Sequence, residues 1–93
     1  MDIRFYCDEE SGLAHCYAQH GIHEREVIEV LRRPGQRLRN TDGTLVAEGQ
    51  TYAGRYLRVI YREHSEPDYI FVITAYDMSA TAKRAYRRWH RRK

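Results

Sequence analysis

The stretch of residues 54–77 constrains the fold most, because it combines two strand-length runs with a polar segment between them. Residues 55–62 alternate between a largely apolar face and a face that carries arginines, which is typical of a strand with one covered side. Residues 69–76 are apolar at nearly every position and rich in β-branched and aromatic side chains, which predicts the middle strand of a sheet. The polar residues 64–68 include Pro67, which cannot donate a ladder hydrogen bond, so they are predicted to form the turn of a hairpin.

A short alternating strand at residues 3–7 and two helices are predicted before this hairpin. Asp8 or Ser11 is expected to cap the first helix, and Gly21 to end it. The second helix covers about residues 24–33, with acids in its first turn and arginines in its last. The inward-facing apolar residues are predicted to be Leu13, Ala14, Tyr17 and Ala18 in the first helix and Val27, Ile28, Val30 and Leu31 in the second.

The segment between the helices and the hairpin has strand and turn character. Residues 36–39 are a candidate edge strand, residues 40–43 carry strong turn chemistry, and residues 45–52 read as a strand. After the hairpin, Ser79 is expected to cap a final helix over residues 80–93. The predicted order is β-α-α-β-β-β-α, an α+β fold with a small antiparallel sheet, two N-terminal helices and a basic C-terminal helix. The apolar stripe of the final helix is predicted to be Ala82, Ala85, Tyr86 and Trp89.

Positive charge is concentrated in that final helix. The chain has 93 residues, enough for one domain over residues 1–93, and a formal net charge of +3. Seven lysines and arginines after residue 82 contribute +7 without an acid, so residues 1–82 sum to −4, which is 3 − 7. This clustering favours binding to RNA or to an acidic partner, and a solvated basic helix is the alternative. The candidate binding residues are Lys83, Arg84, Arg87, Arg88 and Arg91.

Several classes of protein are disfavoured. Cys7 and Cys16 lack the spacing of a zinc site or a disulfide framework and are expected to be small hydrophobic residues in a reducing cytoplasm. No apolar run approaches the ~20 residues of a membrane span, and the start Met1-Asp2 is not typical of a signal peptide. The expectation is a cytoplasmic protein that contacts no membrane and uses no metal or cofactor.

Several short strings occur in a recognisable order. They are the aromatic first strand ending in Asp8-Glu9, the step His20-Gly21-Ile22 before an acidic helix, Gly49, Gly54-Arg55, and Ile73-Thr74-Ala75 before the last helix. With this order and spacing, most of the chain resembles the RelE/ParE-like toxins of toxin–antitoxin modules, within them the BrnT-type branch and its uncharacterised relatives. The resemblance implies a RelE-like fold and a type II toxin that a cognate antitoxin holds silent. It also implies a metal-independent endoribonuclease, in which a 2′-hydroxyl attacks the adjacent phosphate.

Such a reaction needs a base, an acid and cations that stabilise the phosphorane. His20 matches the family's histidine, and an imidazole suits either proton role, although a histidine at a helix end is also favoured by the helix dipole. Arg58 and Arg62 share a strand face about 13 Å apart and are the candidate phosphate ligands, with an ordinary solvated face as the alternative. Arg55 points the opposite way and ranks below them.

Tyr76 is the fourth candidate catalytic residue and a departure from the family pattern. BrnT-type toxins typically carry Ser-Ala-Arg where this chain has Thr74-Ala75-Tyr76. Tyrosine can donate to a phosphate or stack on a base, but it brings no positive charge. The second departure is His23, at a position where the family usually has a serine or threonine cap; it is either a poor cap or an extra site residue.

The strand-associated tyrosines could offer stacking platforms beside basic groups, or they are amphipathic residues at the edge of the core. They are Tyr52, Tyr56, Tyr61, Tyr69 and Tyr76.

Two functions therefore lead. The first is an RNA-cleaving toxin of a type II module, which requires His20 to be accessible from the same side as Arg58 and Arg62. The alternative is a catalytically silent domain of the same fold that binds RNA or a protein partner, supported by Tyr76. A DNA-binding regulator is disfavoured because Glu24 and its neighbours make the second helix acidic. A homodimer is left open.

Overall fold

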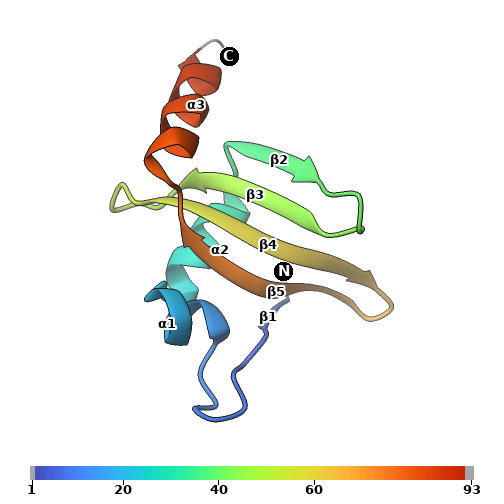
Figure 1. Cartoon of the computed structure of the whole chain (residues 1–93). Coiled ribbons are helices and arrows are strands. Elements are labelled where there is room, and N and C mark those ends of the chain that lie inside the picture. The colour runs from blue at the N-terminus through green and yellow to red at the C-terminus, as the bar shows by residue number, and fades with distance from the viewer. Residues whose placement is uncertain (1, 92–93) are drawn as a thin grey trace.

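The computed structural model describes residues 2–91 and contains eight elements (Figure 1). In chain order they are β1 (Ile3–Phe5), α1 (His15–His20), α2 (Glu24–Arg32), β2 (Gln36–Arg39), β3 (Leu45–Gln50), β4 (Tyr56–Ser65), β5 (Asp68–Asp77) and α3 (Ala80–Arg91). The strands form one sheet in the order β1-β5-β4-β3-β2. The α+β class is confirmed.

Two details of the predicted sheet are wrong. The candidate edge strand does pair, as β2, so the helices are followed by four strands rather than three. The sheet is also mixed, because β1 runs parallel to β5 while the other neighbours are antiparallel. The physical reason is the long connection between β1 and its partner β5, which contains the two helices and the strands β2, β3 and β4. A connection of this length allows two strands to pair in parallel. Local patterns do not report a partner so distant in sequence.

The predicted hairpin is present as β4 and β5, and it is longer than expected. The ladder continues to Ser65 paired with Asp68, so the turn is shorter than residues 64–68. Alternation along β4 is as predicted, with Leu57 and Val59 fully buried and Tyr61 at 3% exposure. The centre of the sheet is β4 rather than β5.

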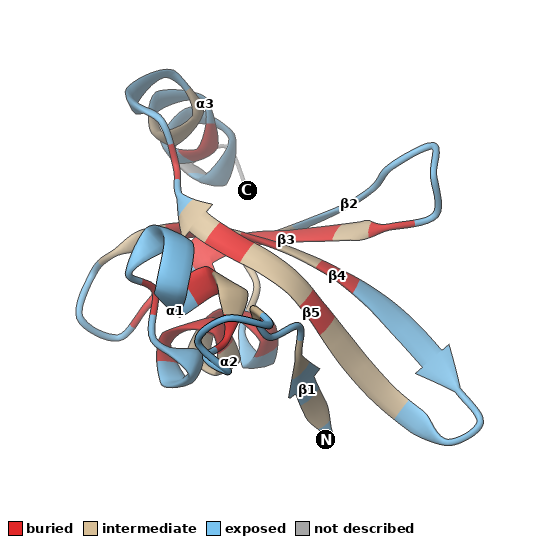
Figure 2. Cartoon of the chain, turned by 60° about the horizontal axis from the view of Figure 1, so that its bottom comes forward, coloured by how far each residue is buried: buried red, intermediate tan, exposed pale blue. Residues whose placement is uncertain are grey.

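The helices α1 and α2 cover one face of the sheet (Figure 2). Val27 and Val30 of α2 are fully buried against Val59 and its neighbours in the core. Gly49 on β3 permits this packing, because a Cβ there would lie 3.2 Å from a methyl group of Val30. The prediction for α2 is confirmed: its bounds agree to within one residue, and Val27, Val30 and Leu31 face the core as expected. Ile28 is only half buried.

The prediction for α1 is wrong at its start and in its stripe. The helix begins at His15, and neither Asp8 nor Ser11 caps it. Asp8 instead accepts hydrogen bonds from the side chains of His15 and Gln19 in α1. Before the helix, Cys7 and Ala14 form an isolated antiparallel β-bridge. Of the predicted stripe only Ala14 is buried, whereas Leu13, Tyr17 and Ala18 are exposed. Of the two cysteines, Cys16 is buried, as expected of a small hydrophobic residue, and Cys7 is exposed. Gly21 ends the helix as predicted, with φ of 67°.

The helix α3 lies on the opposite side of the sheet and projects away from the end of β5 (Figures 1 and 2). Ser79 caps it as predicted, because its Oγ accepts a hydrogen bond of 3.0 Å from the N–H of Ala82. Of the predicted stripe, Tyr86 is buried, Ala82 is half buried, and Ala85 and Trp89 are exposed. Arg92, Lys93 and the side chain of Arg91 lie outside the described residues. Within residues 2–91 the structure has no helix that is both long and apolar enough to cross a membrane.

Candidate functional site: an aromatic groove and a histidine cluster

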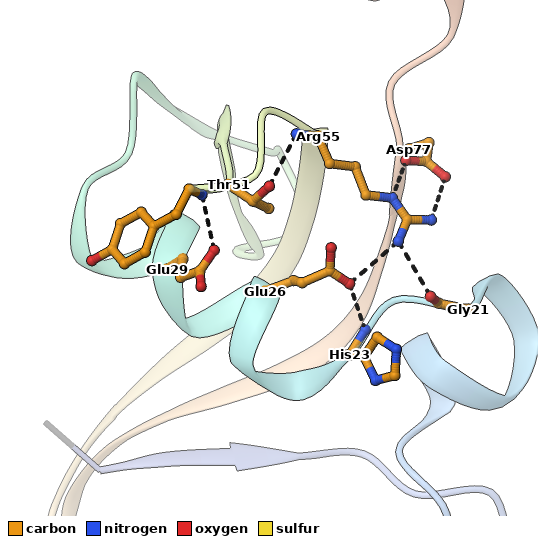
Figure 3. A network of polar contacts seen from close by, with 8 residues as sticks. Gly21, His23, Glu26, Glu29, Thr51, Arg55 and Asp77 are labelled. Carbon is orange, nitrogen blue, oxygen red and sulfur yellow. Dashed lines mark hydrogen bonds and ion pairs between the residues drawn. The ribbon is translucent and has the colours of Figure 1, made fainter.

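Arg55 is the centre of a polar network that ties the helices to the sheet (Figure 3). Its Nε and Nη2 donate to the two carboxylate oxygens of Asp77, at 2.6 and 2.9 Å. Its Nη1 donates to Glu26 at 3.2 Å and to the carbonyl of Gly21 at 3.3 Å. The hydrogen bonds between Arg55 and Asp77 are the main cause that raises the pKa of Arg55 and the main cause that lowers the pKa of Asp77. The guanidinium is thus engaged on two sides, which favours a structural role.

His23 completes this network at the start of α2. It occupies the N-cap position, and its backbone N–H donates to the Glu26 carboxylate at 3.0 Å. Glu26 is only 8% exposed, so its two donors, from Arg55 and His23, compensate the burial of its charge. The backbone N–H of His23 makes this link, and His23 and Glu26 form a capping box at the start of α2.

An open groove of about 950 Å³ lies between α3 and the segments that follow α2 and β3. We call it the α3 groove. Its aromatic and basic lining residues are Tyr52, Tyr56, Tyr86, His90, Arg33 and Arg87, and its other lining residues include Glu29, Pro34 and Gly35. None of the four predicted catalytic residues lines it.

Tyr56 holds α3 in place beside the groove. Its hydroxyl accepts a hydrogen bond of 3.2 Å from Nε of Arg87, and the Nζ of Lys83 lies 5.3 Å from its ring centroid. Its ring meets Tyr86 edge to face at 5.9 Å, and Tyr86 stacks on His90 at 5.5 Å. Two residues of the predicted basic tail are thus fixed against an aromatic ring, as cation–π geometry favours.

Gly35 lies directly against the side chain of Tyr86 and allows it to approach the backbone closely. A Cβ at Gly35 would collide with the Tyr86 hydroxyl and ring. The absence of a side chain at this position therefore lets α3 pack against the segment after α2. Burial raises the pKa of the Tyr86 hydroxyl.

The exposed part of the groove carries one accessible tyrosine ring, that of Tyr52, on the same lining as positive charge. Tyr52 is 71% exposed, although its backbone N–H is held by the Glu29 carboxylate at 3.0 Å. The ring is therefore carried on a fixed backbone and remains accessible. Arg33 and Arg87 lie on the same lining. Rings that present their faces next to guanidinium groups suit unstacked bases and their phosphates.

The four predicted catalytic residues are not gathered into one site. Tyr76 lies next to two of the other three: its ring is 5.9 Å from that of His20, and it pairs directly with Arg58 across β5 and β4, so the side chains of Tyr76 and Arg58 share a sheet face. The Nη1 of Arg58 lies 3.8 Å from buried Glu48. Arg62 is exposed beside the turn at Asp42, whose pKa is lowered mainly by hydrogen bonds from Thr44 and in part by the Arg62 charge.

The remaining predicted binding residues divide into two groups. Lys83 and Arg87 lie on Tyr56, as described, whereas Arg84 and Arg88 are exposed on α3. Among the tyrosines, Tyr61 belongs to the core, and Tyr69 is stacked on His64 at 4.6 Å near the hairpin turn. Only Tyr52 and Tyr56 of that group line the α3 groove.

A second cluster, which the sequence analysis did not predict, surrounds His20. The Nδ1 of His15 lies 2.8 Å from Oδ1 of Asp8, and Gln19 donates to the other oxygen of Asp8 at 3.0 Å. The ring of His15 lies 5.9 Å from that of His20. We call Asp8, His15, His20 and Tyr76 the histidine cluster. The only local signal is the pair His15 and His20, five positions apart, after Asp8, which the sequence predicts to be a helix cap.

Within residues 2–91, no three His, Cys, Asp or Glu side chains come together in a way that could hold a metal ion. The imidazole, carboxylate and phenol groups of the histidine cluster can transfer protons and form hydrogen bonds.

Comparison of the sequence with known protein-family models and with characterised proteins finds no match.

Proposed function

We propose that this protein binds single-stranded RNA in the α3 groove. The observation that carries the proposal is the groove lining, in which Tyr52 and Tyr56 lie beside Arg33 and Arg87 in one open cleft. Stacking of a base on an aromatic side chain contributes about 1–3 kcal/mol, and arginines add contacts to the phosphates.

A single strand fits this surface better than a duplex. The groove carries the exposed ring of Tyr52, and bases expose their faces to such a ring only when they are unstacked. The exposed Arg84 and Arg88 continue the positive charge along α3. Phosphates of a longer strand would release counterions there, so the affinity should fall as salt is added.

The proposal is tested by measuring the affinity of the full chain for a fluorescently labelled single-stranded RNA by anisotropy. Tyr52→Ala should weaken binding about 5- to 100-fold, which corresponds to the loss of one stacked base. Tyr17→Ala is the matched control, because Tyr17 is also exposed but lies on α1. Arg87→Gln should weaken binding, whereas Arg25→Gln on α2 should not. Equal losses in the tyrosine pair would reject the groove as the binding site.

A second candidate function is RNA cleavage by a type II toxin, which the family resemblance implies. The observation that favours it is the contact between His20 and Tyr76, since a proton-transfer group and a phenol lie side by side. In this candidate the fold is RelE-like, Arg58 and Arg62 contribute charge, and a cognate antitoxin covers the basic α3 in the cytoplasm.

The two candidates differ in measurable ways. A toxin should arrest the growth of cells that express the chain alone and should cut mixed RNA in the presence of EDTA. A neighbouring gene for a small acidic or ribbon-helix-helix protein would favour it further. An RNA-binding domain without catalysis should bind RNA, leave it intact and permit growth.

A further inference from the structure

We propose that Asp8, His15 and His20 form an acid–base centre that cleaves RNA, with His15 as the base and His20 as the acid. This inference rests on the proposed RNA binding. It adds two residues that neither the sequence patterns nor the family resemblance assigned to the reaction.

The hydrogen bond to Asp8 determines which nitrogen of His15 is free. An ionised carboxylate only accepts hydrogen bonds, so the Nδ1 of His15, 2.8 Å from Oδ1 of Asp8, must carry the proton. Hydrogen bonds from Gln19 and then from His15 lower the pKa of Asp8, which keeps it ionised. In the neutral ring, Nε2 is consequently the nitrogen that accepts a proton. A base held by a carboxylate in this way has both its tautomer and its orientation fixed.

His20 lies where the second proton is needed. Its ring centroid is 5.9 Å from that of His15. Because hydrogen bonds are about 2.8 Å long, two rings at this separation can reach different oxygens of one phosphodiester. His20 is exposed and the His15 side chain keeps 30% of its surface accessible, so both rings can be approached from solvent.

The charged and titratable groups around His15 and His20 favour one direction from which an RNA phosphate approaches the two rings. Tyr6 and Asp8 face the rings from the segment before α1, and Tyr76 and Asp77 face them from β5. The far side of Asp8 is lined by Glu9 and Glu10, which repel phosphate.

Lys83 connects the histidine cluster to the α3 groove. It lies over Tyr56 of the groove, and its charge, like that of His20, contributes to the lowered pKa of Asp77, for which the Arg55 hydrogen bond is the main cause. Lys83 thus contacts a ring of the α3 groove and lies within electrostatic reach of the same carboxylate as His20.

The reaction balances without a metal or a redox partner. His15 takes the proton of the 2′-hydroxyl as the 2′-oxygen forms a bond to phosphorus. The bond between phosphorus and the 5′-oxygen breaks, and protonated His20 gives its proton to that oxygen. The products are a 2′,3′-cyclic phosphate and a 5′-hydroxyl, and one proton moves from His15 to His20 through solvent before the next cycle.

The experiment measures cleavage and binding separately. A randomised single-stranded RNA pool is incubated with the full chain in EDTA, and cyclic-phosphate ends are counted across a pH series. Anisotropy reports binding, and circular dichroism reports folding. The variants are His15→Gln, His20→Gln and Asp8→Asn, with His64→Gln as control because His64 stacks on Tyr69 near the hairpin turn. A pool with 2′-deoxy residues should not be cut.

We expect the wild type to show a bell-shaped pH dependence, because one imidazole must be neutral and the other protonated. His15→Gln should lose the acidic limb and His20→Gln the basic limb, each with a fall of about 10²- to 10⁴-fold in rate. Asp8→Asn should lower the rate less, and His64→Gln should leave it unchanged. RNA affinity should stay within about twofold in all four variants, since none lies in the α3 groove.

Cleavage that is unaffected by His15→Gln, or lowered equally by His64→Gln, overturns the inference. Binding of intact RNA without any cleavage by the wild type also overturns it, but leaves the proposed RNA binding in place. Cleavage that depends on His15 and is insensitive to Tyr52→Ala supports the inference and rejects the groove. Absence of both binding and cleavage overturns both proposals.

Discussion

The two faces of the sheet are covered in different ways. On the α1/α2 face, Val27, Val30 and Leu57 have no exposed surface, and buried Glu26 is paired with Arg55. On the other face, Tyr86 is the one residue of α3 that is buried among those described, and the helix projects outward. Each fully buried aliphatic side chain contributes about 1.5–3 kcal/mol to folding, so the first face carries most of the stability.

The comparison separates stability from recognition. A helix held mainly by Tyr86 against Gly35 and Tyr56 leaves its arginines and the neighbouring rings accessible. The same ring contacts that seat α3 thus form the wall of the α3 groove. The following predictions test this division, beginning with the largest expected effect.

Removing a side chain from the first face should have the largest effect. Leu57→Ala should lower the free energy of unfolding by about 2–5 kcal/mol, because it removes buried methyl groups and leaves a cavity. Leu38→Ala is the matched control on the opposite face, where Leu38 is 39% exposed, and it should cost less than about 1 kcal/mol. Urea denaturation measures both. Similar costs at the two positions would contradict the division.

Breaking the Arg55 network should have the next largest effect. Arg55→Met leaves the buried Glu26 carboxylate without its guanidinium partner, so we expect a loss of about 1–3 kcal/mol in urea denaturation. Arg25→Met, an exposed position on the same helix as Glu26, should change stability by less than about 0.5 kcal/mol. A phosphate-binding role for Arg55 would instead appear as lost RNA affinity in a variant of unchanged stability.

The same network should make the protein sensitive to acid. The pKa of Asp77 is lowered in the folded state, mainly by its hydrogen bonds to Arg55. The stability that Asp77 contributes to the fold is therefore fully present above its pKa in the unfolded chain, about 3.9, and is lost as the pH falls through its lower pKa in the folded state. The melting temperature should drop below about pH 4, and Asp77→Asn should reduce that drop while already being less stable at neutral pH. An unchanged acid dependence in Asp77→Asn would remove Asp77 as a cause.

The smallest effect on stability should come from the exposed charges of α3. The double variant Arg84→Gln/Arg88→Gln should change the free energy of unfolding by less than about 0.5 kcal/mol. If each arginine contacts a phosphate, the slope of log affinity against log salt should decrease by about 0.7 per residue for a single strand. Titrations at several salt concentrations give the slope, and Arg25→Gln should not alter it.

Elements whose signals are local could be predicted from the sequence. Alternation along β4, the acid-to-base gradient of α2, the stop at Gly21 and the cap at Ser79 each depend on a few neighbouring residues. These four features could be predicted because each depends on residues that are close together in the sequence and that have the expected local conformation in the structure.

Features set by distant partners could not be predicted. The mixed sheet depends on the pairing of β1 with β5, in which Ile3 pairs with Ile70, 67 positions later in the chain. The sequence predicts Asp8 to be a cap because helix caps are short-range, whereas in the structure its partners are side chains on the following helix. The sequence pattern places Arg55 below the other arginines because its partners, Asp77 and Glu26, come from elements that only the fold brings together.

The pairing of β1 with β5 also bears on how the chain is made. During synthesis, the N-terminal strand leaves the ribosome long before its partner does, and β4 and β5 emerge after both helices that must pack on them. Contacts of such large sequence separation slow folding and leave apolar surface uncovered in the meantime. We therefore expect the nascent chain to acquire its native core only after β5 has emerged. Until then the apolar side of α2 is a target for chaperones.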